Sequence, residues 1–404
     1  MSENKTAVVL PGSAWQVPLV KRLKKCGHAV FVVDPHDDPP ARAFADGQLQ
    51  SDIFDIKAVE SYCKQVGADA LMSDECDIAM PLVARLCARL SLGGIDEQSA
   101  HLFTNKHAMR EFCKRNGIAH PEYELCRTAS DARAFFQETE GPVVLKPLDS
   151  NSSRGVHIVK DACDIPEAFE DALSFSKAED AVLIERFIAG REFTVDGVKT
   201  PNTHYSLAIS IKKHFRHNAS IASELYFTNY SNEFDYQELK TVNDRLMNCS
   251  PLFFGLTHAE YKFQDGTFYL IEAAARGGGN LISSHIVPFI SGFDNYGYLI
   301  DCCLGGAHPV SYELTESLVD RCAVLKFLDC PTGGGIVKEV RNADIFDTIP
   351  EIVAHGFNFK PGDIVDDAVN DATRLGFYIA LCQSQDRLGS IMQAISQEVT
   401  IELR

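Results

Sequence analysis

The sequence predicts a multidomain protein in which an α/β part is followed by α+β parts. Its 404 residues exceed what one ordinary hydrophobic core accommodates, so about two to four domains are expected. Apolar segments at 7–12, 29–34 and 69–74 alternate with helical segments, which is typical of a parallel sheet built from βαβ units. From about residue 125 short strands predominate, and the pattern changes again at residue 306.

Acidic residues follow two of the predicted parallel strands, with Asp34 after one and Asp74 and Glu75 after another. Ligands of open α/β sheets bind at the carboxyl ends of the strands, so a binding role is one interpretation. Capping of the helices that follow is the other.

The composition argues against several classes of protein. With 38 Lys and Arg against 56 Asp and Glu, the formal net charge is -18, so we expect no nucleic-acid partner. The 13 cysteines include no C-x-x-C pair, which favours reduced thiols in a cytoplasmic protein over a disulfide or zinc framework. We identify neither a signal peptide nor an apolar stretch near the roughly 18 residues that span a bilayer, and therefore expect no membrane partner.

A predicted hairpin carries two acids, Glu260 and Glu272, with Asp265-Gly266 as its turn. A two-residue loop would put the two carboxylates on opposite faces, whereas a three-residue loop with Gly266 in the left-handed region would put them on one face. We expect the second arrangement. Carboxylates placed side by side repel unless a cation lies between them, and Mg²⁺ commonly binds one or two carboxylates together with phosphate oxygens. The alternative is a hairpin whose acids face water.

Small residues dominate the loop at 148–155, between predicted strands at 141–147 and 156–159. Hydroxyls, backbone amides and Arg154 in such a turn suit a lid over phosphates, with Lys146 as a point charge on the strand beneath. A plain serine-rich turn is the alternative. Further on, the linker 186–188 offers backbone polar groups beside apolar side chains, which suits an adenine ring as well as an ordinary connection.

Five segments in order resemble the ATP-grasp superfamily, in particular its carboxylate-amine ligases such as L-amino acid ligases. Biotin carboxylase and the large subunit of carbamoyl phosphate synthetase resemble the chain more distantly. The resemblance implies a Rossmann-like domain at 1–103, a two-lobed ATP-grasp domain at 104–305 with its lid lobe at about 125–187, and a small C-terminal domain at 306–404. The five segments are TNK (104–106), VVLKPLDSNSSRGV (143–156), LIERFIAGREFTVDG (183–197), HAEYKF (258–263) and IEAAARGGG (271–279).

The resemblance also implies a nucleotide site. Lys106 and Lys146 would contact the ATP phosphates, and the loop residues Ser152, Ser153, Arg154 and Gly155 would cover them. The segment Glu185, Arg186, Phe187 and Ile188 would hold adenine, and Glu192 would lie on the ribose side.

For the metal and the substrates, the resemblance implies that Glu260 and Glu272 bind Mg²⁺, or Mn²⁺ in its place. The family often has asparagine as a further metal ligand where this chain has Ala274, so binding of one or two ions stays open, with Asn280 as an alternative oxygen donor. Arg276 would grip the substrate carboxylate or the acyl-phosphate.

The catalytic candidates are therefore Arg276, Lys146 and Gly278, because a glycine turn at 277–279 lets backbone amides approach an oxyanion. Further candidates for the substrate pocket are Gly277, Asn280 and His285, together with the basic run Lys212-Lys213-His214. Solvated loop residues are the alternative for His285 and for the basic run.

The activity that follows is that of an ADP-forming ligase, which joins a small carboxylic acid to an amine through an acyl-phosphate and makes an amide or peptide bond. An amino acid or a small amine would be one substrate. A carboxylating or purine-pathway enzyme and a catalytically inactive nucleotide-binding regulator are the alternatives. We expect ATP and the two small substrates as partners, and a homodimer as the candidate assembly.

Overall fold

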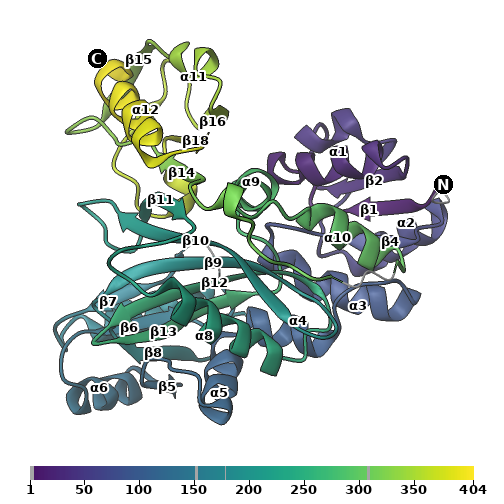
Figure 1. Cartoon of the computed structure of the whole chain (residues 1–404). Coiled ribbons are helices and arrows are strands. Elements are labelled where there is room, and N and C mark those ends of the chain that lie inside the picture. Colours follow the sequence, from purple (N-terminus) through teal and green to yellow (C-terminus); the bar gives the residue numbers. More distant parts are fainter. Residues whose placement is uncertain (1–3, 151–152, 178, 307–309) are drawn as a thin grey trace.

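The computed structural model describes residues 4–150, 153–177, 179–306 and 310–404. Three parts are visible in Figure 1: an N-terminal part, a central part with the largest sheet, and a C-terminal part that carries the last helix. Among the described residues, no helix is both long enough and apolar enough to cross a membrane.

The N-terminal part is a parallel sheet, as the alternating pattern predicts, and its strand order is β3-β2-β1-β4. Strand β3 was not predicted, because its sequence GQLQ has no β-branched or aromatic residue. The strands are β1 (Thr6–Val9), β2 (Ala29–Asp34), β3 (Gly47–Gln50) and β4 (Ala70–Met72), and the helices are α1 (Val17–Lys25), α2 (Ile56–Val66) and α3 (Met80–Leu90).

Two helices lead from this sheet into a small antiparallel sheet with the order β5-β8-β6-β7, which we call the lid sheet. It spans the segment expected for a lid lobe, and two further helices pack against it. The connecting helices are α4 (Glu97–Thr104) and α5 (Lys106–Asn116). The lid elements are β5 (Tyr123–Cys126), α6 (Ala129–Glu138), β6 (Val143–Pro147), β7 (His157–Val159), α7 (Ile165–Phe175) and β8 (Val182–Arg186).

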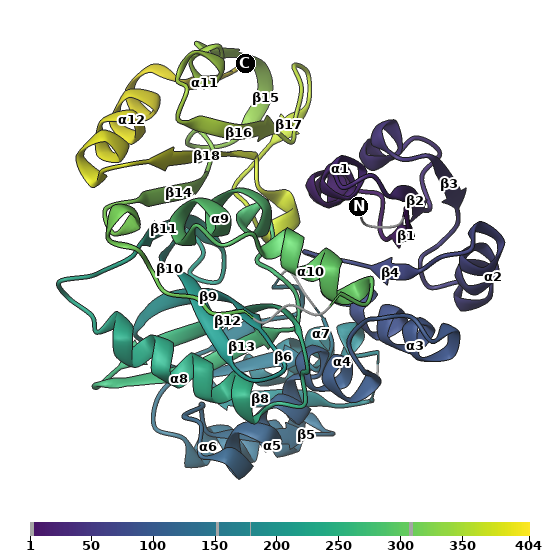
Figure 2. The ribbon, with the colours of Figure 1, turned by 45° about the vertical axis from the view of Figure 1, so that its right-hand side comes forward.

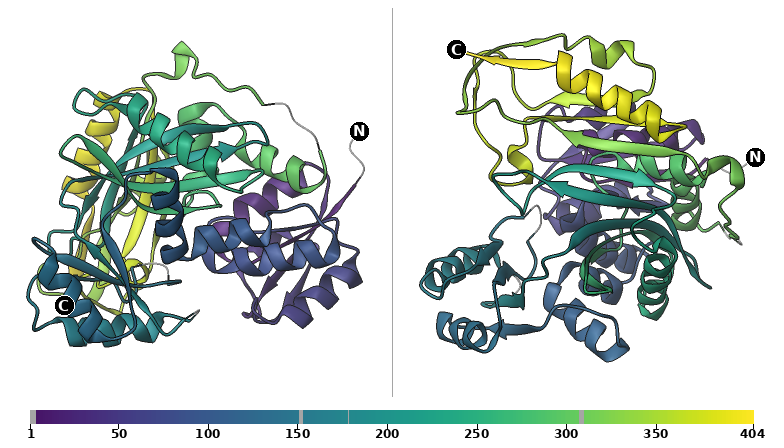
Figure 3. Two further views of the ribbon diagram at one scale, coloured as in Figure 1. Left: turned by 90° about the horizontal axis from the view of Figure 1, so that it is seen from below. Right: turned by 60° about the vertical axis from the view of Figure 1, so that its left-hand side comes forward.

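The largest sheet has eight strands in the order β13-β12-β9-β10-β11-β14-β18-β16. It crosses the expected domain boundary at residue 306, because β11 pairs with β14 from the C-terminal part. The strands are β9 (Arg191–Lys199), β10 (His204–His214), β11 (Ala222–Thr228), β12 (Gly255–Gln264), β13 (Thr267–Ala274), β14 (Cys322–Phe327), β16 (Ile352–Phe357) and β18 (Gly376–Cys382). Figure 3 shows the lid sheet and the C-terminal part at opposite ends of it.

The remaining elements cover this sheet or complete the C-terminal part, where a three-stranded sheet has the order β17-β15-β19. Helix α10 lies between the N-terminal sheet and the central part (Figure 2). The helices are α8 (Tyr236–Cys249), α9 (Val287–Ser291), α10 (Asn295–Cys303), α11 (Ile345–Thr348) and α12 (Gln385–Glu398), and the strands are β15 (Gly335–Arg341), β17 (Ile364–Val365) and β19 (Thr400–Leu403).

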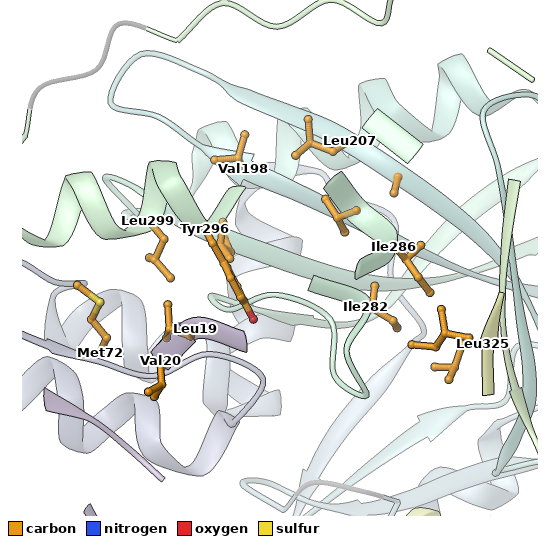
Figure 4. Packing of buried hydrophobic residues seen from close by; sticks show 14 of the residues in the cluster. Leu19, Val20, Met72, Val198, Leu207, Ile282, Ile286, Tyr296, Leu299 and Leu325 are labelled. Atoms are coloured by element: carbon orange, nitrogen blue, oxygen red, sulfur yellow. The ribbon is translucent and has the colours of Figure 1, made fainter. Parts of the chain in front are cut away.

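One hydrophobic cluster joins the three parts. Leu19 of α1 and Met72 of β4 belong to the same buried cluster as Leu299 of α10, Ile286 and Leu325 of β14, as Figure 4 shows. Burial of apolar surface is non-directional but cumulative, so a continuous core holds the parts together. The position of the N-terminal part against the large sheet is therefore set by packing.

The turn of the β12–β13 hairpin differs from the expectation, but the two acids lie side by side as expected. The loop has two residues, Asp265 and Gly266, with φ angles of 51° and 77°, so the expected three-residue loop is wrong. A register shift next to Glu260 then leaves Ile271 as an extra residue on β13, and beyond it Glu260 pairs directly with Glu272. The expectation that the two acids lie side by side is confirmed, although a bulge and not the turn produces it.

The bulge has an identifiable partner. Nη2 of Arg110, on α5, donates a hydrogen bond to the carbonyl oxygen of Ile271 at 2.6 Å. Next to it, the amide of Leu270 donates to the carbonyl of Ala119 at 2.9 Å. Two backbone groups at the bulge of this edge strand are thus satisfied by the segment around α5.

We expect Arg110→Met to lower the free energy of unfolding by about 3–5 kcal/mol, because Arg110 is 1% exposed and the change removes one partner of the buried Glu185. Urea titration followed by circular dichroism measures the loss. Arg115→Met, at an exposed position of the same helix, is the matched control and should change stability by less than about 0.5 kcal/mol. A loss below about 1 kcal/mol for Arg110→Met would contradict the role given to this side chain.

Candidate active site

A cavity of about 150 Å³ lies where the lid sheet faces the large sheet, and it gathers most residues of the expected nucleotide site. Of the expected residues, Arg154 and Gly155 do not line it, and Ser152 lies outside the described residues. Those that line it are Lys106, Lys146, Ser153, Glu185, Arg186, Phe187, Ile188, Glu192, Glu260 and Glu272.

A second cavity, of about 520 Å³, continues from the first. Both cavities are lined by Ser153, Lys212, Ser220, Glu260 and Glu272, so the paired acids stand at the boundary between them. The second cavity is also lined by Arg276 and Asn280, whereas Gly277, Gly278 and His285 line neither. Nδ1 of His285 instead lies 2.7 Å from Oγ of Ser284, and burial lowers the pKa of His285.

Lys146 is held by a buried carboxylate. Its Nζ lies 2.6 Å from one oxygen of Glu185, and Nε of Arg110 donates to the other oxygen at 2.6 Å. Burial lowers the pKa of Lys146 to about 8, while the charge of Glu185 opposes that shift. Burial would raise the pKa of Glu185, but Arg110 and Lys146 outweigh it and lower the pKa. The carboxylate of Glu185 therefore positions a lysine, and its contact with adenine stays a prediction.

Two backbone amides of the segment after Glu185 are already paired. The amide of Arg186 donates to the carbonyl of Glu122, and that of Phe187 donates to the carbonyl of Pro142, both at 2.9 Å. The ring of Phe187 lies 4.7 Å from Nζ of Lys262 and lines the smaller cavity. An adenine site here stays a prediction, and it would use the apolar side chains and Ile188 more than those two amides.

Lys106 lies between the loop after β6 and the second acid of the hairpin. Asn105 caps the helix that begins at Lys106, and its side chain accepts from the amide of Ala108 at 2.9 Å. Nζ of Lys106 donates to the carbonyl of Ser150 at 2.7 Å and lies 3.1 Å from Glu272. The first turn of α5 thus carries a lysine into the smaller cavity.

A third lysine, Lys212, neutralises two further acids. Nζ of Lys212, on β10, lies 2.7 Å from Glu192 and 2.9 Å from Glu260. Burial would raise the pKa of Glu192, but the charges of Lys212 and His214 outweigh it and lower the pKa to about 2. Against the same effect of burial, Lys212 holds the pKa of Glu260 well below its usual range. Both acids are therefore ionised.

The two hairpin acids suit a magnesium ion whose coordination is completed by oxygens of other groups. Among the described residues, no group of three or more His, Cys, Asp or Glu side chains is arranged to hold a metal by itself. Glu260 and Glu272 form a directly paired set of carboxylate oxygens at the boundary of the two cavities. Mg²⁺ is commonly held by one or two carboxylates, water and substrate phosphate, so the two residues fit it.

His258 was not identified from the sequence, although strand period places it on the same face as Glu260. Its Nδ1 lies 3.0 Å from Oδ1 of the buried Asp196. Burial would lower the pKa of His258, but Asp196 outweighs that effect and raises the pKa to about 9. The imidazole is therefore a cation beside Glu260, with Nε2 at 3.7 Å from that carboxylate.

The glycine turn after β13 packs against carboxylates. The amide of Gly277 donates to Asp74 at 2.7 Å, and the amide of Gly278 donates to Asp196 at 2.9 Å. A Cβ at Gly277 would lie 2.1 Å from Oγ of Ser283, and one at Gly278 would lie 2.5 Å from Asp196. Close packing thus explains the need for these two glycines, and their contact with an oxyanion stays a prediction.

Arg276 is tied to the N-terminal part. Its Nε and Nη2 donate to the two oxygens of Asp77 at 2.8 and 2.5 Å, and Nη1 donates to the carbonyl of Gly277 at 2.8 Å. A bidentate fork of this kind fixes the plane of the guanidinium. Its contact with a substrate carboxylate stays a prediction, and the structure adds Asp77 as the residue that orients it.

Residues 139–285 match the family model described as an ATP-grasp domain. The chain contains an ATP-grasp domain. Dapdiamide A synthase of Enterobacter agglomerans is 24% identical over 308 residues, which cover 74% of this chain and 70% of that protein. Alanine–anticapsin ligase of Bacillus subtilis is 24% identical over 294 residues, which cover 66% of this chain and 60% of that protein.

The crystal structure of the L-amino acid ligase from Bacillus licheniformis covers 100% of this chain and is itself covered to 100%, with a TM-score of 0.84 at 18% identity. That likeness confirms the expected fold class, with an N-terminal parallel sheet, an ATP-grasp domain of two lobes and a C-terminal part. The resemblance drawn from the five motifs is confirmed as well.

We expect affinity for a non-hydrolysable ATP analogue to fall as the pH rises above about 8. Lys146 has a pKa of about 8 without nucleotide, and phosphates favour its charged form, so binding above that pH must take up a proton. The dissociation constant should then rise by up to about tenfold per pH unit. Isothermal titration calorimetry measures it, and Lys146→Arg should flatten the profile because arginine keeps its charge. The same slope in that variant would assign the proton to another group.

Proposed function

We propose that this protein is an ADP-forming carboxylate-amine ligase that makes an amide or peptide bond through an acyl-phosphate. The observation that carries the proposal is the shared wall of the two cavities, which contains Glu260 and Glu272. A nucleotide in the smaller cavity and a carboxylic acid in the larger one would meet at these acids. The relatives named as a ligase and a synthase support an ATP-dependent enzyme that forms an amide bond and favour it over the alternatives.

In the first step, an oxygen of the carboxylate substrate attacks the γ-phosphorus of ATP, and ADP leaves. Lys106 and Lys146 bind the phosphates and stabilise the negative charge that is transferred. Glu260 and Glu272 would hold Mg²⁺, which neutralises charge on the phosphate oxygens when it is bound. The lid sheet, by covering the smaller cavity, excludes water that would hydrolyse the acyl-phosphate.

In the second step, the nitrogen of the amine attacks the acyl carbon, and inorganic phosphate leaves as the amide forms. The positive charges of Arg276 and His258 on the wall of the larger cavity stabilise the oxyanion that develops on the acyl oxygen. The amine must lose a proton, and the departing phosphate is a base that can take it. A nucleophilic side chain has no part in this sequence of steps.

The direct test is a screen of carboxylate and amine pairs with ATP and Mg²⁺, read out as phosphate release and product mass. A pair-dependent release of phosphate with a product lighter by one water than the summed substrates is the expected result. Release that depends on bicarbonate or on a phosphoribosylated amine would instead assign the alternative activities. ATP binding without any substrate-dependent turnover would favour a regulatory protein.

We expect Glu272→Gln to lower the turnover number by about two to four decades, because it removes a charge that holds the metal at the transferred phosphate. Steady-state phosphate release measures the change. Asp265→Asn, which removes the same charge at the exposed tip of the same hairpin, is the matched control and should keep nearly full activity. A near-normal rate for Glu272→Gln would refute the metal assignment.

A further inference from the structure

The larger cavity is closed on one side by the C-terminal part, and a buried arginine stands in that wall. Arg374 follows the short turn before β18, is 7% exposed and lines the cavity together with Phe327 and Phe377. The ring of Phe377 in turn lies 5.6 Å from the ring of Trp15, from the N-terminal part. The wall is thus formed where the N-terminal and C-terminal parts meet.

The orientation of the Arg374 guanidinium is fixed by its neighbours, but its charge is balanced by only one carboxylate contact. Its Cζ lies 3.8 Å from the centre of the Phe327 ring, and Nε donates to the carbonyl of Ala222 at 3.2 Å. Nη2 lies 2.7 Å from a single oxygen of Asp371, whose side chain is 29% exposed. Burial lowers the pKa of Arg374, with Asp371 and Glu260 opposing the shift. A guanidinium has five N–H donors, so it can bind a further anion in this position.

The other permanent cations on this cavity wall are more fully engaged. Lys212 contacts the buried Glu192 as well as Glu260, and Arg276 contacts both oxygens of Asp77. Moving either side chain to a substrate therefore breaks two charged contacts. Arg374 has a single contact with Asp371, whose side chain is 29% exposed and can turn to water, so it can share or exchange that acid at lower cost.

When the amine substrate is an amino acid, the reaction involves two carboxylates: the one that is activated and the free one of the amine substrate. The position of Arg374 helps to distinguish them. The carboxylate that becomes the acyl-phosphate must lie beside Glu260 and Glu272, at the boundary of the cavities. Arg374 lines the larger cavity and does not line the smaller one. Because Arg374 does not line the boundary at which the activated carboxylate must lie, a carboxylate bound by Arg374 fits the other substrate better. Leu225 and Leu325 line the same cavity and offer apolar surface to a side chain.

We propose that Arg374 binds the free carboxylate of the amine substrate and so restricts that substrate to amino acids that carry one, against amines and amino-acid amides. This inference rests on the proposed ligase function, because it assigns a residue to its second substrate. Asp371 then acts as the counter-ion that Arg374 shares or releases when the acceptor binds.

The test uses the full-length protein and the amino-acid pair found active in the screen of unmodified amino acids with ATP and Mg²⁺. The acceptor, identified by fragmentation of the product in tandem mass spectrometry as the residue that keeps a free carboxylate, is then replaced by its carboxamide. For the unchanged protein we expect the KM of the carboxamide to exceed that of the amino acid by about 30-fold or more. In Arg374→Gln the KM of the amino acid should rise by a similar factor, and the discrimination between the two should disappear.

Two controls separate recognition from folding. Arg387→Gln removes an exposed arginine of the same C-terminal part, and it should change neither KM nor discrimination. Asp371→Asn keeps the guanidinium and removes its counter-ion, so the KM of the amino acid should stay equal or fall while discrimination persists. This second variant tests the inference even if Arg374→Gln does not fold. The KM of ATP should stay the same in all three variants.

Several results would overturn the inference. Equal use of amino acid and carboxamide by the unchanged protein would show that the acceptor carboxylate is not recognised. Full discrimination in a folded Arg374→Gln, or its loss in Asp371→Asn, would assign recognition to another residue. Without any active pair the ligase function itself fails, which is distinguishable from loss of acceptor selectivity alone.

Discussion

The side chain of Arg110 connects the two surfaces between which the nucleotide cavity lies. One of its nitrogens binds Glu185 of the lid sheet, which in turn holds Lys146, and another binds the carbonyl of the bulged Ile271 in the large sheet. The bulge brings Glu272 opposite its partner acid, so one buried cation fixes both Lys146, which we propose binds phosphate, and a candidate metal ligand. Interactions of this kind are strong because the interior screens them weakly.

Charge balance in the site depends on lysines that the substrates would also use. Lys106 contacts Glu272, and Lys212 bridges Glu192 and Glu260, so each hairpin acid already has a cationic partner. A divalent ion on the hairpin acids would compete for the same oxygens and would release these ammonium groups toward phosphate. Binding of metal and of nucleotide would therefore support each other through the same few charges.

Local sequence signals predicted the elements that carry the site, but long-range contacts decided how the residues are used. The parallel sheet of the N-terminal part was recognised from its alternating pattern, and the Asp265-Gly266 turn from its composition. The bulge at Ile271 could not be predicted, because its partner, Arg110, lies 161 residues away in sequence. For the same reason Asp196 was not identified, and the contact of Asp74 with the glycine turn was not predicted.

Because the large sheet continues from the ATP-grasp strands into the C-terminal part, the last hundred or so residues are not a detachable module. Strand β11 is paired on one side with β10 and on the other with β14. Without β14, its sequence ASELYFT would present a row of unsatisfied amides and carbonyls beside apolar side chains. Exposed edges of that kind recruit strands from other molecules. A chain shortened at the expected boundary would accordingly be prone to aggregate, and exchange of C-terminal parts between relatives would have to preserve the register of β11 with β14.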